Sequence, residues 1–212
     1  MCFVVKSDLL LRQMRKGISR PIVIVFARAP KYGAVKTRLA REIGAAETLR
    51  FYRGTLTRLV RRLRRDGRFE VVLAVTPDAA VAARGIWPAG VRLLPQGDGD
   101  LGRRMMRALR AAGARPAVLI GSDIPSITPT HIARAFAALG RASVALGPAR
   151  DGGYWLIGAR HPARLRETAL DGVRWSSTDT MRDTMARLAD ASVLDDTLDD
   201  VDTAVQYRKS VR

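Results

Sequence analysis

Six runs of apolar residues along the chain predict the strands of a β-sheet. The runs are rich in Val, Ile, Leu and Ala, and their length is that of buried strands. They lie at residues 22–26, 70–76, 91–95, 117–121, 143–147 and 154–158. Helical patterns separate most of them, which is typical of an α/β fold with a mostly parallel sheet.

Five amphipathic helices are predicted among these strands. In the longest, residues 45–65, leucines and arginines recur at helical spacing, so one face is apolar and the other is basic. Thr128 followed by Pro129 indicates an N-cap and a proline at the first helical position. The helices are expected at residues 45–65, 77–84, 101–112, 129–139 and 178–189.

The composition is that of a single globular domain. The chain has 212 residues, of which 47% are hydrophobic and 27% charged, enough for one core. Residues 1–20 scatter charges among apolar residues and lack the pattern of a secretory signal. We therefore expect a loose extension at residues 1–20 and one domain at residues 21–212.

Cysteine usage and hydropathy indicate a cytoplasmic protein. Cys2 is the only cysteine, so an intramolecular disulfide and a cysteine-based zinc cluster are excluded. No run reaches the roughly 18 apolar residues of a membrane span. We expect cytoplasmic localisation and no membrane span.

The net charge of +17 is concentrated near the amino terminus, since residues 1–68 hold 18 Lys or Arg and 4 Asp or Glu. Many of these arginines form the outer face of the predicted helix at residues 45–65, which indicates a solvated surface. No helix-turn-helix, zinc-finger or RNA-binding aromatic pattern accompanies them, so we expect no specific nucleic-acid partner. A non-enzymatic protein that binds a polyanion through this helix is an alternative to the two enzymatic functions considered below.

A cationic loop at Phe26–Leu39 follows the first predicted strand. Gly33 can adopt a positive φ, and Lys36, Thr37 and Arg38 lie where the next helix begins. Such a loop at the carboxyl end of a first strand suits a bound phosphate. It is not a Walker loop, which needs glycine and lysine adjacent, so a P-loop kinase is not expected.

Glycine and aspartate are concentrated in three further loops at predicted strand ends. In an open parallel sheet, ligands bind where strands end in loops. Glycine allows close approach of a ligand, and aspartate can hold a hard cation. The loops are Gln96–Gly102, Gly121–Pro125 and Gly147–Gly153.

Together with Trp175–Thr180 and Asp200–Thr203, these loops resemble a family of small bacterial GT-A-like transferases. The family is called rSAM/selenodomain-associated transferase and belongs to the nucleotide-diphospho-sugar transferase superfamily. It is associated with glycosyl transfer, including arsenosugar biosynthesis. The resemblance covers about residues 21–203 and implies one three-layer α/β/α Rossmann-like GT-A domain.

The resemblance also implies a nucleotide site and a metal site. Asp123 occupies the position at which GT-A enzymes place a metal-binding aspartate, and Asp200 and Asp202 would add carboxylates from the tail. Mg²⁺ or Mn²⁺ is the expected cofactor, since oxygen ligands suit hard cations. The implied nucleotide-binding residues are Arg28, Lys31, Gly33, Lys36, Arg38, Gln96, Gly97, Asp100 and Gly102.

Acceptor binding is expected in the glycine-rich loop before the last predicted strand. Gly152, Gly153 and Tyr154 are the candidate acceptor-binding residues, and Asp151 is the candidate general base. Lys36 and Arg38 are the candidates that stabilise charge on the reacting phosphates.

Two reactions fit these residues, and the first is our leading hypothesis. A nucleotide diphosphate sugar gives its glycosyl group to a small hydroxyl acceptor, or a phosphorylated small molecule attacks a nucleoside triphosphate and pyrophosphate leaves. GT-A glycosyltransferases usually show Asp-x-Asp at the metal site, whereas Ser122-Asp123-Ile124 is closer to nucleotidyltransferases. The family commonly continues Asp200–Thr203 with Pro-Glu-Asp-Leu, and this chain instead has Ala204–Tyr207.

Overall fold

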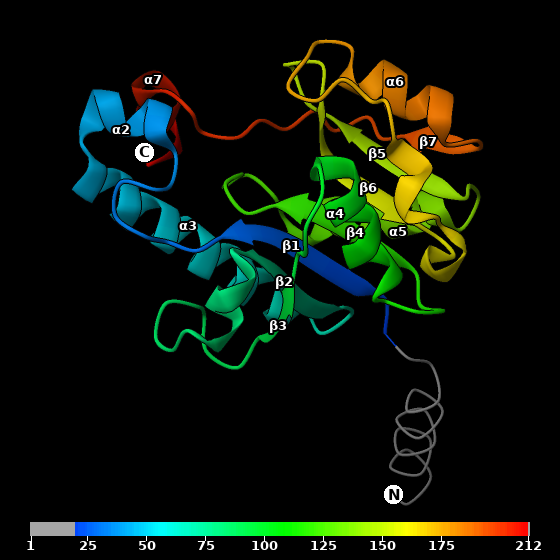
Figure 1. The fold of residues 1–212 in the computed structure, drawn as a ribbon, viewed down its shortest axis with the longest axis horizontal. Helices are drawn as coiled ribbons and strands as arrows, with labels where there is room; N and C mark the ends of the chain where they lie inside the picture. Colours follow the sequence, from blue (N-terminus) through cyan, green and yellow to red (C-terminus); the bar gives the residue numbers. More distant parts are fainter. Residues whose placement is uncertain (1–19, 212) are drawn as a thin grey trace, which may run out of the picture.

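A seven-stranded sheet forms the centre of the computed structural model, which describes residues 20–211 (Figure 1). The strand order is β3-β2-β1-β4-β6-β5-β7. The strands are β1 (Ile22–Arg28), β2 (Glu70–Thr76), β3 (Arg92–Pro95), β4 (Ala117–Gly121), β5 (Val144–Pro148), β6 (Tyr154–Ala159) and β7 (Ala191–Val193). The predicted extension falls outside the described residues except for Arg20.

The sheet is mostly parallel, as the sequence predicts. β1 pairs in parallel with β2 and β4, β2 with β3, and β5 with β7. β6 runs antiparallel to both β4 and β5. The six predicted strands are confirmed to within two residues at each end. β7 was not predicted, because three partly exposed residues are too short to show a pattern.

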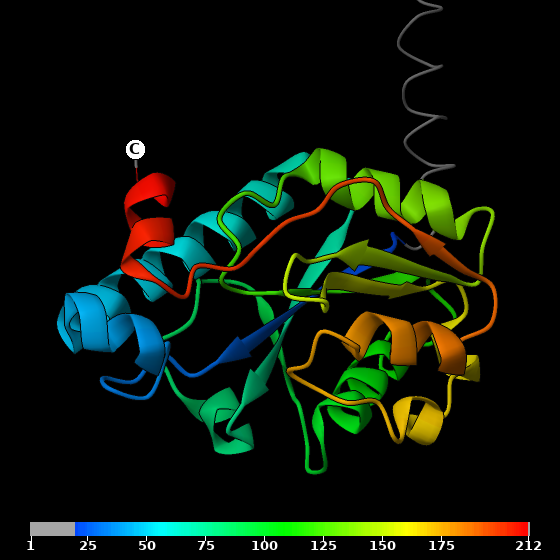
Figure 2. The same ribbon diagram turned by 90° about the horizontal axis from the view of Figure 1, so that it is seen from above.

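Helices cover both faces of the sheet, which confirms the three-layer α/β/α fold (Figure 2). α3 and α5 lie on one face, and α4 and α6 lie on the other. The helices are α2 (Thr37–Ile43), α3 (Ala45–Asp66), α4 (Leu101–Arg110), α5 (Pro129–Leu139), α6 (Thr180–Arg187) and α7 (Ala204–Ser210). Among the described residues, none of the helices has the length and apolar character needed to cross a membrane.

Alternate residues of each central strand enter two separate cores. Val23 packs with Leu59 of α3 in one core, whereas Ile24 packs with Leu109 of α4 in the other. Because both faces of β1 are covered, its sequence is a continuous apolar run rather than an alternating one.

Two predicted features of the helices differ from the structure. The predicted helix at residues 77–84 is a short 3₁₀ helix, Asp78–Ala82, of which only Ala80 is buried, so it lacks the apolar face that a longer helix would need. α7 was not predicted, because its seven residues, Ala204–Ser210, are too few to show a clear helical pattern. Its start is fixed by a capping box between Thr203 and Gln206.

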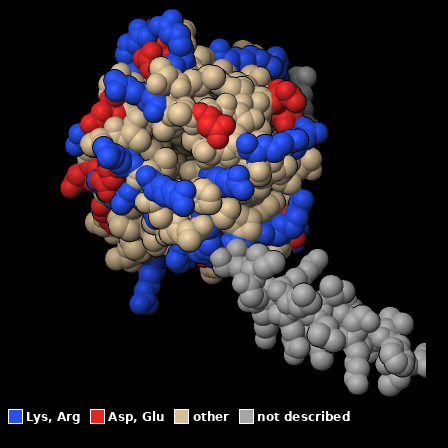
Figure 3. Space-filling model, turned by 90° about the vertical axis from the view of Figure 1, so that its right-hand side faces the viewer, with Lys and Arg blue, Asp and Glu red and all other residues tan. Residues whose placement is uncertain are grey.

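Several arginines of α3 make structural hydrogen bonds to backbone carbonyls. Arg62 donates to the carbonyl oxygens of Pro125 and Ile127, and Arg64 donates to that of Ala89. On the face shown in Figure 3, basic side chains are interrupted by acidic and uncharged ones. Neither observation favours a continuous basic stripe of the kind that a polyanion-binding surface would need.

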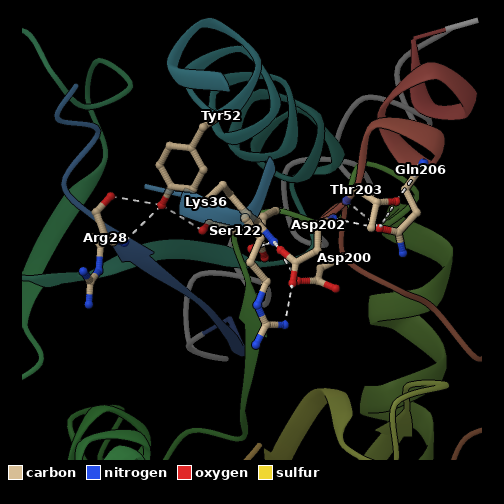
Figure 4. Close-up of polar contacts among 10 residues, drawn as sticks. Arg28, Lys36, Tyr52, Ser122, Asp200, Asp202, Thr203 and Gln206 are labelled. Atoms are coloured by element: carbon tan, nitrogen blue, oxygen red, sulfur yellow. Dashed lines mark hydrogen bonds and ion pairs between the residues drawn. The ribbon is translucent and has the colours of Figure 1, made fainter. Parts of the chain in front are cut away.

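Tyr52 of α3 joins the ends of the two central strands. Its hydroxyl donates to the carbonyl oxygen of Arg28 and accepts from the backbone N–H of Arg28, both at 3.0 Å. It also lies 3.0 Å from the Ser122 hydroxyl, directly after β4 (Figure 4). Burial raises the pKa of Tyr52 above its usual value, so the hydroxyl stays protonated. This contact fixes the spacing of the loops that follow β1 and β4.

Replacing Tyr52 by Phe is expected to lower the free energy of unfolding by about 1–3 kcal/mol, because buried polar groups of Arg28 and Ser122 lose their partner. Urea denaturation followed by circular dichroism measures this change. Tyr32→Phe is the matched control, since Tyr32 is 71% exposed and should change stability by less than about 0.5 kcal/mol. Equal stability of Tyr52→Phe and the unsubstituted chain would contradict the role of this contact.

Candidate active site

Three segments that are distant in sequence meet at the carboxyl edge of the sheet (Figure 4). They are the loop after β1, the turn after β4, and the tail between β7 and α7. Lys36 comes from the first, Asp123 from the second, and Asp200 and Asp202 from the third. The carboxyl edge is where ligands bind in open parallel sheets.

The ammonium group of Lys36 lies among three carboxylates. Its Nζ is 2.6 Å from Asp123 Oδ2, 2.6 Å from Asp200 Oδ2 and 2.7 Å from Asp202 Oδ1. The Lys36 side chain is only 8% exposed, whereas the three aspartates are 25–43% exposed. The buried Lys36 ammonium therefore faces three partly exposed carboxylates at this edge of the sheet.

The pKa shifts follow from this crowding. Burial opposes the charged form of Lys36, but Asp123 and Asp200 outweigh it and raise the pKa of Lys36 above its usual value. Burial also raises the pKa of Asp200, and the charges of Asp123 and Asp202 add to this rise against the opposing effect of Lys36. The pKa of Asp200 is therefore raised mainly by its burial, even though its carboxylate contacts the Lys36 ammonium.

The backbone of Lys36 is left-handed, with φ 46° and ψ 51°. A residue other than glycine in this region costs on the order of 1 kcal/mol. Buried side chains on both sides, Val35 and Leu39, hold the segment in place. Strain of this kind is concentrated at functional sites, which supports a role for Lys36 beyond stability.

Buried and polar residues alternate in the tail, and this alternation places its two aspartates in the site. Val201 is buried against Leu39 and Phe51, and its N–H donates to the carbonyl oxygen of Asp123 at 3.3 Å. Asp200 and Asp202, on either side of Val201, both reach Lys36. A single buried valine thus places two carboxylates at one cation.

α7 anchors the end of this tail. Gln206 Oε1 accepts hydrogen bonds from the backbone N–H groups of Asp202 and Thr203 at 2.8 and 2.9 Å. The Tyr207 ring packs edge-on against Phe51, with centroids 5.2 Å apart. Where the resembled family has Pro-Glu-Asp-Leu, this chain therefore has Gln206, which caps the helix, and Tyr207, which packs on Phe51.

The three carboxylates have the donor chemistry of a site for a hard divalent cation. All the donors are oxygens, they converge on the Lys36 ammonium, and they keep an excess of negative charge even with the exposed Arg38 at 3.8 Å from Asp202. In residues 20–211, no three acidic, His or Cys side chains are arranged to hold a metal ion by themselves. The ammonium of Lys36 takes the cation position among the carboxylates, so a metal ion would have to displace it.

A cleft of about 290 Å³ opens on one side of Asp123. Its basic side chains are Arg28, Lys36 and Arg104, and its apolar walls include Phe26 and Leu101. A second hollow of about 280 Å³ adjoins it and is lined by Arg28, Lys36, Thr37, Arg38 and Asp202. We call these two adjoining hollows the cationic cleft.

A second cleft, of about 260 Å³, opens on the other side of Asp123. Its apolar and aromatic walls include Met105, Tyr154 and Trp175, and its acidic side chains are Asp123, Asp151 and Asp200. No lysine or arginine lines it within the described chain. We call it the acidic cleft.

Several residues predicted from the sequence line these clefts. Gln96 is buried in the cationic cleft, where its amide donates to the backbone oxygens of Ala27 and Ala74. The acidic cleft contains the predicted acceptor-loop residues Asp151, Gly153 and Tyr154. The Arg38 side chain is 81% exposed and lies 3.8 Å from Asp202 Oδ2.

Other predicted residues have structural positions and do not line either cleft. Asp100 caps α4 by accepting a hydrogen bond from the Arg103 N–H, and a Cβ on Gly102 would lie 2.8 Å from Trp175. A Cβ on Gly152 would lie 2.3 Å from the backbone oxygen of Thr178. Lys31 and Gly33 lie in an exposed turn, and the Gly97 N–H donates to Asp78 Oδ1.

The sequence prediction missed Arg104 and Phe26 as cleft residues. Arg104 lies within the glycine-rich stretch and its following helix, but helical periodicity alone does not distinguish it from the exposed Arg103. Phe26 is the last residue of the first predicted strand, which suggests a buried position. Only the contact of α4 with the end of β1 shows that Arg104 and Phe26 share one edge of the sheet.

The chain is similar to one family and to several solved structures. The family described as "Uncharacterized protein conserved in bacteria (DUF2064)" matches residues 59–177. A "putative nucleotide-diphospho-sugar transferase" from Desulfovibrio desulfuricans G20 is 29% identical, with 88% of this chain and 84% of that chain covered and a TM-score of 0.78. No curated protein matches the chain.

Two more distant structures share the fold alone. The 4-diphosphocytidyl-2C-methyl-D-erythritol synthase of Anaerococcus prevotii DSM 20548 is 10% identical over 90% of this chain and 94% of that chain, with a TM-score of 0.59. The manganese complex of Rv0371c from Mycobacterium tuberculosis H37Rv is 16% identical over 91% of this chain and 98% of that chain, with a TM-score of 0.50. The comparisons support a transferase that uses a nucleotide substrate.

Replacing Lys36 by Met is expected to destabilise the chain by about 1–3 kcal/mol in the absence of divalent cations, because three partly buried carboxylates lose their counter-charge. Millimolar Mg²⁺ or Mn²⁺ should restore the lost stability, and thermal unfolding with and without chelator measures both effects. Lys31→Met, at an exposed position, is the control and should respond to neither. A Lys36→Met chain that is as stable as the unsubstituted one in chelator would contradict this account of the cluster.

Proposed function

The chain belongs to the DUF2064 family, and we propose that it transfers a glycosyl group from a nucleotide diphosphate sugar to a small hydroxyl acceptor. The observation that carries the proposal is that two clefts of opposite charge share Asp123. A transferase with a diphosphate leaving group needs cations on the side of the leaving group and a deprotonating group on the side of the acceptor. The narrower assignment to arsenosugar biosynthesis stays a prediction.

The cationic cleft supports binding of a nucleotide diphosphate. Arg28 and Lys36 line both of its hollows, and Arg38 lines the second. Within residues 20–211, no carboxylate lies at ion-pair distance from Arg28, so its charge is available to an anionic ligand. Guanidinium groups bind phosphate oxygens through charge-assisted hydrogen bonds.

Asp123, Asp200 and Asp202 are the residues that would hold a divalent ion. When bound, Mg²⁺ or Mn²⁺ would neutralise charge that develops on the leaving diphosphate. The fold relative from Mycobacterium tuberculosis that was solved with manganese supports this choice of cofactor. Lys36, no longer held by the three carboxylates, would then stabilise the leaving group together with Arg28 and Arg38.

The acidic cleft favours glycosyl transfer over nucleotidyl transfer. Asp123 and Asp200 would be engaged with the divalent ion, but a phosphorylated acceptor would still bring a dianion next to Asp151, with no lysine or arginine among the described lining residues. Like charges at such short range are strongly unfavourable. A neutral hydroxyl compound meets no such cost, and the Trp175 and Met105 walls suit the apolar face of a sugar ring or of another small molecule.

Nucleotidyl transfer is the second candidate, and one feature of the site favours it. A single carboxylate, Asp123, follows β4, where glycosyltransferases of this fold usually carry two. In that reaction Lys36 and Arg38 would stabilise the transition state at the α-phosphate.

Asp151 is our candidate for the general base. Its carboxylate is exposed on the acidic cleft and accepts a hydrogen bond from the Gly153 N–H at 2.9 Å. The neighbouring Arg150 pairs with Asp199 at 2.7 Å, and no cation pairs with Asp151 among the described residues. Asp151 is therefore placed to accept a proton from an acceptor hydroxyl in this cleft.

Asp123→Asn is expected to weaken binding of a nucleotide diphosphate sugar in Mg²⁺ by at least about tenfold, because one of the three carboxylates that would hold the cation is lost. Isothermal titration calorimetry measures the affinity. The control is Asp195→Asn, an exposed acid of the same tail, which should bind as the unsubstituted chain does. Undiminished affinity of Asp123→Asn would refute the metal role of Asp123.

Incubation with a UDP- or GDP-sugar and a hydroxyl acceptor is expected to release nucleoside diphosphate, and Asp151→Asn should slow this release about 100-fold or more. Donor affinity should not change, because Asp151 lies in the acidic cleft. Release of pyrophosphate from a nucleoside triphosphate and a phosphorylated acceptor would instead establish the second candidate.

A further inference from the structure

Arg104 on α4 is a cation of the cationic cleft that the proposed chemistry does not use. No carboxylate lies within ion-pair distance of its guanidinium among the described residues, and its Nε is buried without a hydrogen-bond partner there. The guanidinium carbon lies 5.8 Å from the centre of the Phe26 ring. Burial, and then the charge of Arg28, lower the pKa of Arg104 from its usual value. A cation in such surroundings remains without compensation until a ligand arrives.

Gln96 holds this guanidinium in a fixed orientation. The Gln96 side chain is 1% exposed, and its amide nitrogen donates to the backbone oxygens of Ala74 and Ala27 at 2.8 and 3.3 Å. Its Oε1 therefore faces Arg104 and accepts a hydrogen bond from Arg104 Nη2. Both ends of the amide are engaged, so the rotamer of Gln96 and with it the plane of the guanidinium are set before a ligand binds.

The surroundings of Arg104 suit a nucleobase better than a phosphate. Arg104 lines only one hollow of the cationic cleft, with Phe26, Leu101 and Gln96, whereas Arg28 and Lys36 line both hollows and Arg38 lines only the other. Cations for phosphates therefore extend through both hollows, and the apolar and planar groups beside Arg104 lie only in the first. Because Nε of Arg104 is buried and Nη2 donates to Gln96, Nη1 is the group that is left to donate to the edge of a nucleobase packed among these side chains.

We propose that Arg104 selects the nucleobase of the donor by donating to a keto oxygen, so that the donor carries guanine, uracil or cytosine rather than adenine. This inference rests on the proposed function. Guanine, uracil and cytosine each present a keto oxygen, and adenine presents none. Adenine has acceptors only on its ring nitrogens, and its exocyclic group is an amino donor, so a donor that is aimed at an exocyclic oxygen loses its partner with ADP. Gln96 acts through Arg104 as a positioning residue.

Calorimetric titration of the full chain in Mg²⁺ with GDP, UDP, CDP and ADP tests this inference. At least one of the first three is expected to bind about tenfold or more tightly than ADP. Arg104→Met should lower the affinity for that nucleotide by about 10–100-fold and change the ADP affinity by less than about threefold. Arg104→Lys, which keeps the charge but loses the planar fork, should also lose most of the selectivity.

Arg103→Met is the matched control for these variants. Arg103 is the neighbouring residue of α4, but its guanidinium pairs at the surface with Asp171, with Nη2 to Oδ2 at 2.9 Å. Its replacement is expected to leave all four affinities unchanged. Melting temperatures of the three variants establish that each is folded in the titration.

Two results would overturn the inference while leaving the proposed function standing. One is that the unsubstituted chain binds ADP as tightly as the other three nucleotides. The other is that Arg104→Met weakens all four by the same factor, which would make Arg104 a phosphate ligand. Binding of none of the four nucleotides would instead overturn the proposed function together with the inference.

Discussion

The ion cluster around Lys36 is the interaction on which the site depends. One ammonium joins the loop after β1, the turn after β4 and the tail before α7, through contacts of 2.6–2.7 Å to Asp123, Asp200 and Asp202. The closure of the tail over the sheet edge is therefore electrostatic as well as hydrophobic. Because three carboxylates face one lysine, the cluster holds the fold together and still has an excess of negative charge that can recruit a divalent cation.

The position of the tail does not depend on Lys36 alone. The tail is held independently of Lys36 by Val201, which is buried against Phe51, and by the docking of α7. A cation can therefore replace the ammonium without release of the aspartates from the crevice. If Lys36 were the only contact of the tail, displacement of its ammonium by a divalent cation would release the tail. The site would then lose Asp200 and Asp202, which are two of its three carboxylates.

The layers of the fold and much of the site were predicted from the sequence, because both depend on local patterns of residues. The apolar runs of β1 and β4 are visible in the sequence, and so are Lys36 and Asp123 in the loops that follow them. The contact between Lys36 and the carboxylates was not predicted, because it depends on how far the tail folds back. Arg104 was missed for a related reason: its role depends on the packing of α4 against the end of β1, and helical periodicity does not record which arginine lacks an acidic partner.

The antiparallel strand β6 explains why one aspartate borders two clefts of opposite charge. β6 pairs with β4 so that Leu156 lies opposite Ile120, and its first residue, Tyr154, is therefore at the same sheet edge as Asp123. The turn before β6 places Asp151 there as well, on the side away from the cations of the first loop. Had β6 been parallel, its preceding turn would lie at the opposite edge of the sheet. The reversal of this one strand thus brings an acidic surface beside a cationic one, with Asp123 and Leu101 lining both.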